Sequence, residues 1–174
     1  MSHYTVAVIT EDGKEDTVAI ALAPYHEYEC TGVDDKYVIW VDVHDEMIAD
    51  HAKYEKDGAP FDEAWVEGWN GAKLRDGRYH RYTNPNAKWD WWQIGGRWSN
   101  MLNGKKDTAQ KNELGELPDT FAYLIDGEWI ERGRMGWWAI VSDEKSDDEW
   151  TASKAKIWEK IPDDAYITIV DCHI

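Results

Sequence analysis

Residues 4–10 of the 174-residue chain read Tyr4-Thr-Val-Ala-Val-Ile-Thr10, and a similar stretch, Tyr166-Ile-Thr-Ile-Val170, lies close to the other end of the sequence. Both stretches are rich in β-branched residues, which pack well on a pleated and partly buried surface. We therefore expect a strand near each end of the chain. If these strands are antiparallel neighbours in one sheet, His3 and His173 approach one another.

The patterns between these two strands favour an α+β fold with a single domain over residues 1–174. We expect a mixed or antiparallel sheet with helices packed on one face, and ferredoxin-like folds are one such arrangement. Asp126-Gly127, flanked by residues 120–125 and 128–131, predicts a tight hairpin because Gly tolerates positive φ. Ser146-Asp-Asp-Glu149 is a capping box that opens a helix ending near Lys160. The other expected elements are strands over residues 18–23, 37–43 and 135–141, and helices over residues 44–56 and 61–69.

The composition is that of an acidic protein. Asp and Glu number 35 against 19 Lys and Arg, so the formal net charge is −16. Repulsion of this kind opposes stable binding to duplex nucleic acid or to an anionic membrane. Cys30 and Cys172 match no paired-cysteine zinc spacing, and the first residues have neither a basic nor an apolar leader region. We therefore expect a cytoplasmic protein with reduced thiols and no cofactor.

One segment reverses this charge. Eight basic residues and only two acidic ones lie between Lys73 and Lys106. A basic segment within an acidic protein attracts a compact anion, while the surrounding charge repels extended polyanions. This segment is therefore the first place to look for a ligand site.

Aromatic and basic side chains alternate within the same segment. Indole rings stack on nucleobases and guanidinium groups bind phosphate in a bidentate manner, so this mixture predicts a nucleotide-like ligand. Gly95-Gly96 would let the backbone turn sharply or approach a ligand, with its amides facing an anion. The predicted ligand-binding residues are Arg78, His80, Arg81, Lys88, Trp89, Trp91, Trp92, Gly95, Gly96, Arg97 and Trp98.

A second interpretation of the tryptophans stays open. They would form part of the core, with the arginines paired to carboxylates elsewhere in the chain. In a strand, Trp89 and Trp91 would share one face and Trp92 would lie on the other. One face would then bind a ligand while the other packs.

Possible metal ligands raise another alternative. Terminal-strand pairing would gather several of them, but adjacent strand residues point to opposite faces, so Cys172 and His173 would not both bind one ion. No hydrolase, kinase or calcium-loop motif accompanies them. The candidate ligands are His3, His26, Cys30, Asp171, Cys172 and His173.

Five stretches carry a resemblance to a known family. They are Ser2-His-Tyr-Thr-Val6, Leu22-Ala-Pro-Tyr-His-Glu-Tyr-Glu-Cys-Thr-Gly32, Asn84-Pro-Asn-Ala-Lys-Trp-Asp-Trp-Trp-Gln-Ile-Gly-Gly-Arg-Trp98, Met135-Gly-Trp-Trp138 and Val170-Asp-Cys-His-Ile174. The chain resembles small uncharacterised proteins encoded by tailed bacteriophages and related mobile elements. The resemblance implies an accessory protein in an infected host cell, where such factors inhibit or sequester host components, including defence proteins and their nucleotide signals. It implies no catalytic residue.

Three functions therefore compete. The leading hypothesis is a non-enzymatic phage binding protein that sequesters a nucleotide-like anion through the Trp- and Arg-rich segment. The first alternative is an acidic inhibitor that imitates nucleic-acid charge and binds a host defence protein. The second is a metal-dependent hydrolase built around the terminal histidines. Homo-oligomerisation is compatible with each of them.

Overall fold

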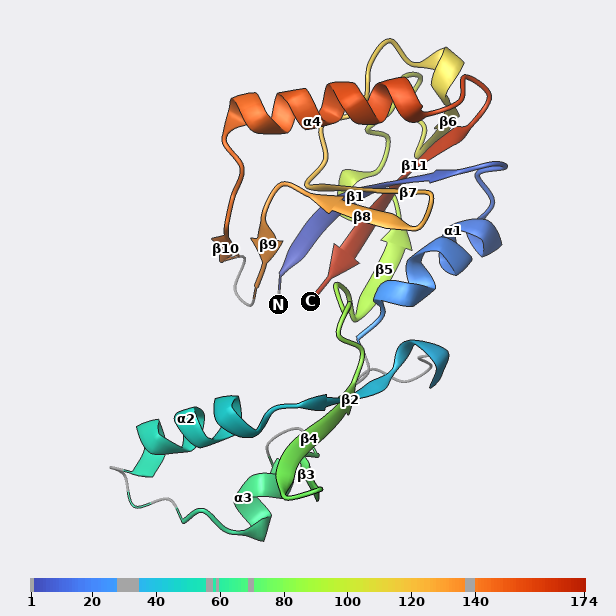
Figure 1. Ribbon diagram of the computed structural model, residues 1–174. Helices are drawn as coiled ribbons and strands as arrows, with labels where there is room; N and C mark the ends of the chain where they lie inside the picture. Colours follow the sequence, from blue (N-terminus) through green and yellow to red (C-terminus); the bar gives the residue numbers. More distant parts are fainter. Residues whose placement is uncertain (1, 28–34, 56–57, 59, 69–70, 137–139) are drawn as a thin grey trace. The chain divides into compact units, whose positions relative to one another are not determined.

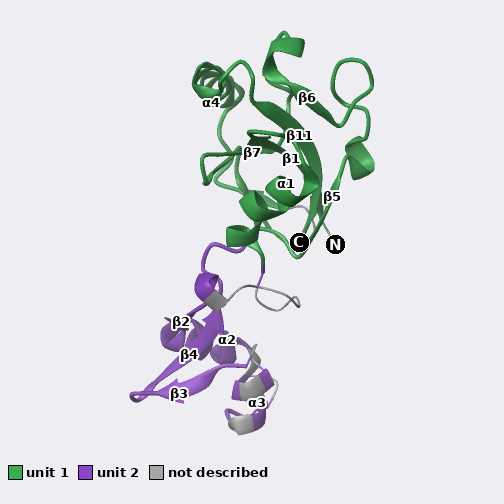
Figure 2. Ribbon diagram, turned by 90° about the vertical axis from the view of Figure 1, so that its right-hand side faces the viewer, with its two compact units in different colours: residues 1–26, 88–174 green, residues 27–87 purple. Residues whose placement is uncertain are grey.

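The computed structural model describes residues 2–27, 35–55, 58, 60–68, 71–136 and 140–174. The chain divides into two compact units. Unit 1 comprises Met1–His26 and Lys88–Ile174, and unit 2 comprises Glu27–Ala87, so the second unit is an insertion in the sequence of the first (Figure 2). The expectation of one domain over residues 1–174 stays a prediction.

Unit 1 is built on a mixed six-stranded sheet in the order β5-β11-β1-β7-β8, with β6 also paired to β11. The first and last strands are antiparallel neighbours, in a register that runs from His3↔His173 to Thr10↔Tyr166. β7 is parallel to β1, and β8 returns antiparallel to β7. The strands are β1 (His3–Thr10), β5 (Trp91–Ile94), β6 (Thr108–Gln110), β7 (Ala122–Ile125), β8 (Glu128–Glu131) and β11 (Tyr166–His173), and the helices are α1 (Glu15–Leu22) and α4 (Asp147–Lys160).

The two helices of unit 1 cover opposite faces of this sheet (Figure 1). Val18 of α1 packs in one buried cluster with Val6 and Val8, whereas Trp150 of α4 packs in another with Ala7. Successive side chains of a strand point to opposite faces, so the two clusters lie on either side of β1. The expected α+β class and mixed sheet are confirmed. The expectation that the helices share one face, as in ferredoxin-like folds, is corrected.

Two predicted strands have a different structure. Residues 18–23 lie mostly in helix α1, because Val18 and Leu22 are four residues apart, share one side of a helix and are both fully buried. Met135 and Val141, expected within one strand, pair with each other across β9 (Arg134–Met135) and β10 (Val141–Ser142). The chain therefore reverses between them, and residues 137–139 lie outside the described residues.

Unit 2 has a small antiparallel sheet in the order β2-β4-β3. Met47, Val66 and Ala72 form its buried hydrophobic cluster, and they come from the two helices and from the residue before β3. The elements are β2 (Ile39–Asp42), α2 (His44–Tyr54), α3 (Glu63–Gly68), β3 (Lys73–Arg75) and β4 (Arg78–Thr83). The described residues include the short 3-10 helices η1 (Ala23–Tyr25), η2 (Asp35–Tyr37), η4 (Gly96–Trp98) and η5 (Lys111–Glu113). Among the described residues, no helix combines the length and the apolar character needed to cross a membrane.

Two local predictions are confirmed in detail. Asp126 and Gly127 have φ values of 51° and 74° in the turn between β7 and β8, as a tight hairpin requires. Ser146 caps α4: the Glu149 amide donates to its hydroxyl oxygen, and the Glu149 carboxylate accepts from the Ser146 amide at 2.9 Å. The hydrogen bonds from Ser146, the side-chain one first, lower the pKa of Glu149.

Ser146→Ala should lower the free energy of unfolding by about 1 kcal/mol at neutral pH, because it removes one half of this capping box. Because folding lowers the pKa of Glu149, its carboxylate stabilises the folded protein at pH values above the usual Glu pKa. This stabilisation is lost as the pH falls through the pKa that Glu149 has in the folded state. Urea denaturation of the wild-type and Ser146→Ala proteins at pH 7 and pH 3 measures their free energies of unfolding. The difference between the two free energies should be smaller at pH 3 than at pH 7. An equal difference at both values would contradict the reciprocal cap.

Candidate functional site

The residues predicted to bind a ligand are divided between the two units. Arg78, His80 and Arg81 lie on β4 in unit 2, whereas residues 88–98 belong to unit 1. The two groups are close in sequence, but each belongs to a different compact body. The structure therefore does not bring all of them together in one unit.

Two of the predicted cationic residues already have carboxylate partners. Arg78 donates from Nε to Asp42 at 2.5 Å and from Nη2 to Asp45 at 2.9 Å. The bond to Asp42 is the main cause of the raised pKa of Arg78. Lys88 donates from Nζ to Glu131 at 2.8 Å. A ligand phosphate would have to compete with these carboxylates at both positions.

Trp89 is a core residue. Only 6% of it is exposed, its Nε1 donates to the Leu22 carbonyl at 3.1 Å, and its ring stacks on His26 with centroids 4.3 Å apart. Burial lowers the pKa of His26, so this imidazole is neutral at pH 7. Trp89 packs in the same cluster as Trp92, which corrects the expectation that it shares a face with Trp91. The reason is that Trp89 pairs with His26 ahead of β5, which begins only at Trp91.

Gly95 and Gly96 make a sharp turn where the chain leaves β5. Their φ values are +69° and +54°, in the region that favours glycine. A Cβ on Gly96 would lie 2.5 Å from the Cβ of Asp171, so the backbone passes directly over this side chain. The next amide, that of Arg97, donates to Asp171 Oδ2 at 3.0 Å. The close approach predicted for a ligand anion is therefore made to a carboxylate of the protein itself.

Asp171 connects this turn to the first of two histidine–aspartate pairs. It is 2% exposed, and its second oxygen, Oδ1, lies 2.8 Å from Nδ1 of His3. In the second pair, Asp90 Oδ1 lies 2.5 Å from Nδ1 of His173. An ionised carboxylate accepts only, so Nδ1 is the nitrogen that carries the proton in both rings. No hydrogen bond within the described residues involves Nε2 of either imidazole.

The two histidines are neighbours, as the expected pairing of the terminal strands implies. They are register partners on β1 and β11, and their ring centroids are 5.0 Å apart at an angle of 67°. Trp91, the register partner of His173 on β5, is 46% exposed, and its ring lies 6.3 Å from that of His3. Arg97 is exposed, and its amide is fixed by Asp171. We call His3, His173, Trp91 and Arg97 the histidine face.

Cys172 lies on the other side of the sheet. It is fully buried in the cluster that contains Val6, and burial raises the pKa of its thiol well above the ordinary value. A neutral thiol is a poor metal ligand, which agrees with the expectation that Cys172 and His173 do not share an ion. Within the described part of the chain, no three His, Cys, Asp or Glu residues form a group able to hold a metal.

Asp90 is the residue of this arrangement that the sequence analysis missed. It stands immediately before β5, and its amide donates to the His173 carbonyl at 2.9 Å. Its position between Trp89 and Trp91 in an otherwise basic segment was the available signal. That signal points to His173 as the partner of Asp90 only once β5 is known to pair with β11.

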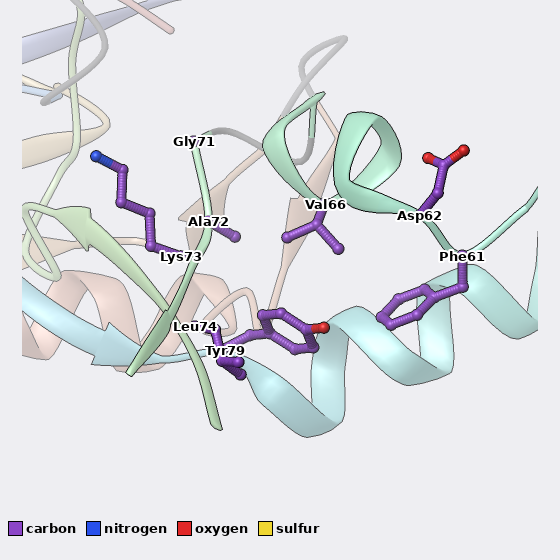
Figure 3. A pocket seen from close by; sticks show the side chains of 8 residues that line it. All are labelled: Phe61, Asp62, Val66, Gly71, Ala72, Lys73, Leu74 and Tyr79. Atoms are coloured by element: carbon purple, nitrogen blue, oxygen red, sulfur yellow. The ribbon is translucent and has the colours of Figure 1, made fainter. Parts of the chain in front are cut away.

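A pocket of about 540 Å³ lies in unit 2, and none of the residues predicted to bind a ligand is among those that line it. Figure 3 shows the side chains of Phe61, Val66 and Tyr79 around it, while Asp62 and Lys73 extend outward. Ligand sites usually add a few convergent polar groups to an apolar lining. The histidine face combines such polar groups with an exposed ring, so it is the stronger candidate.

No protein-family model, curated protein or solved structure matches the chain. The resemblance to phage proteins therefore stays a prediction.

Gly96→Ala should destabilise the protein by about 2 kcal/mol, because a Cβ would meet Asp171 and because φ is positive. Gly127→Ala is the matched control: φ is +74° there, but a Cβ would meet nothing within 4 Å. The control should cost only about 1 kcal/mol. Urea denaturation of both variants measures the difference. Equal losses would show that the contact with Asp171 is unimportant.

The thiol of Cys172 should be unreactive in the folded protein, because burial keeps it protonated and inaccessible. Cys30→Ser leaves it as the only cysteine. Ellman's reagent at pH 8 should then detect no thiol until urea unfolds the chain. Rapid reaction of the folded variant would contradict the packing described for β11.

Proposed function

We propose that this protein binds a compact nucleotide-like anion at the histidine face and sequesters it as a phage accessory protein in the host cell. The proposal keeps Trp91 and Arg97 from the predicted site and adds the two histidines. Trp89, Arg78 and Lys88 have structural roles in this proposal, because their contacts are made within the protein.

The observation that carries the proposal is the exposure of Trp91 beside two imidazoles. Trp92 and Trp98 are half-buried and pack against the two core clusters, whereas 46% of Trp91 is exposed. Stacking of a base on an exposed aromatic ring is worth about 1–3 kcal/mol. An imidazole whose Nδ1–H donates to a carboxylate can, when protonated, also donate from Nε2–H to a phosphate oxygen. A nucleotide has both groups in one molecule.

Charge supports a small ligand over a long one. The net charge of −16 repels an extended polyanion, whose phosphates would lie along the acidic surface. A mono- or dinucleotide has few charges and meets only the local surface. Arg97 is exposed and has no ion-pair partner among the described residues, so its guanidinium is available to an anion.

The acidic surface itself supports a second proposal, namely binding of a basic cleft on a host defence protein. It is motivated by the excess of 35 acidic over 19 basic residues. Binding of this kind weakens steeply with salt and is indifferent to Trp91. The same variants therefore separate the two proposals.

Trp91→Ala should weaken nucleotide binding roughly tenfold, as expected for the loss of one stacked base, and Arg97→Ala should weaken it by a similar factor. Titration calorimetry with a panel of linear and cyclic ribonucleotides, supported by quenching of Trp fluorescence, measures the dissociation constants. Trp40→Ala removes an exposed tryptophan of unit 2 and is the matched control, with binding unchanged.

Two results would count against the proposal. One is an absence of binding by the wild-type protein to every member of the panel at millimolar concentration. The other is equal affinity of the Trp91→Ala and wild-type proteins for a ligand that does bind. Unchanged thermal unfolding of both variants shows that any loss arises at the surface.

A further inference from the structure

The two imidazoles of the histidine face are held in the way that acid–base catalysis requires. A carboxylate on Nδ1 fixes the tautomer and the orientation of a ring, so that Nε2 is the nitrogen that takes up or releases a proton. Asp171 does this for His3 at 2.8 Å, and Asp90 does it for His173 at 2.5 Å. A surface histidine that only contributes charge needs no such partner.

Asp171 is fixed more firmly than an ordinary surface carboxylate. It is 2% exposed, and both of its oxygens are used, one by His3 and the other by the amide of Arg97. Placing an ionised carboxylate inside a protein is costly unless hydrogen bonds compensate for the lost water. Its second bond exists only because Gly96 allows the backbone to pass directly over it.

The two rings also lie at a useful separation. His3 and His173 face each other across the β1–β11 ladder with centroids 5.0 Å apart. Their side chains are 19% and 12% exposed, so a part of each ring is accessible. One phosphodiester group is large enough to contact both rings at once. A single phosphate contact would need only one of them.

We propose that His3 and His173 are a general acid–base pair that cleaves a short ribonucleotide at its 3′–5′ phosphodiester bond. This inference rests on the proposed function, since the substrate is the nucleotide bound at the same face. Trp91 stacks on one base, and Asp90 and Asp171 are positioning residues.

The step balances within the substrate and the two imidazoles. The neutral imidazole removes the proton of the 2′-hydroxyl, and the 2′-oxygen forms a bond to phosphorus. The bond from phosphorus to the 5′-oxygen breaks, and the protonated imidazole donates its proton to that oxygen. The products are a 2′,3′-cyclic phosphate and a free 5′-hydroxyl. The nucleophile is part of the substrate, so the step has no co-reactant.

The chemistry of the surrounding residues favours this step over one in which the histidines bind a metal. Both neighbouring carboxylates are already bound to Nδ1 atoms, and the Cys172 thiol lies on the opposite face of the sheet. Two imidazoles alone are an incomplete set for zinc, which takes at least three protein ligands in catalytic sites. Sensitivity to a chelator distinguishes the two cases.

The test uses the whole protein with uridylyl-(3′→5′)-adenosine and cyclic di-GMP as probes. Mass spectrometry should detect a product that ends in a 2′,3′-cyclic phosphate. His3→Gln and His173→Gln should each lower kcat by about 100-fold or more, the range of a lost general acid or base. Their dissociation constants should stay within a few-fold of wild type, because Gln keeps a hydrogen-bonding group. Asp90→Asn should lower kcat with little change in KM.

The controls separate this inference from the proposed function. The 2′-deoxy analogues should bind without cleavage, EDTA should have no effect, and Trp40→Ala should cleave at the wild-type rate. Binding of the ribonucleotide probes without cleavage would overturn the inference and leave the binding function intact. Failure to bind any nucleotide would overturn both. Cleavage of a 2′-deoxy analogue would show that the 2′-oxygen is not the nucleophile. Loss of activity with EDTA would show that the reaction needs a metal ion.

Discussion

The antiparallel ladder between β1 and β11 organises unit 1, since every other strand of its main sheet joins this pair directly or through β7. Backbone hydrogen bonds set the register, and the side-chain period of two then assigns each residue to one face. If β1 slipped by one residue against β11, its side chains would exchange faces of the sheet. Val6 would then leave its core cluster for the opposite face, and His3 would also change faces. The same pairing that closes the core therefore brings the two histidines together.

Asp171 connects the sheet to the turn that follows β5 through a hydrogen bond. A buried carboxylate is tolerated only with good hydrogen bonds, and it has them from His3 and the Arg97 amide. Stability and the geometry of the histidine face are consequently coupled at one side chain. The glycine turn has a structural reason in the tight space above Asp171, independent of any ligand.

Trp89 and Trp91 show how local context separates similar residues. Trp89 stacks on His26, and its Nε1 donates to the carbonyl of Leu22 at the end of α1, so both its apolar ring and its N–H are satisfied inside the protein. Trp91 lies on an outer strand with nearly half of its surface exposed. Trp91 is thus an exposed ring beside two imidazoles that are each held by a carboxylate at Nδ1, in a chain whose formal net charge is −16.

The sequence alone determined the features that depend on neighbouring residues: the terminal strands, the Asp126-Gly127 hairpin, the capped helix α4 and, through strand pairing, the approach of His3 to His173. These follow from backbone preferences and short-range hydrogen bonds. Only the tertiary structure decided which faces the helices cover, that Arg78 belongs to a different unit from Arg97, and that Asp90 and Asp171 hold the histidines. Such contacts join residues as far apart as His3 and Asp171, and their formation depends on burial and on the order of strands, which no local pattern specifies.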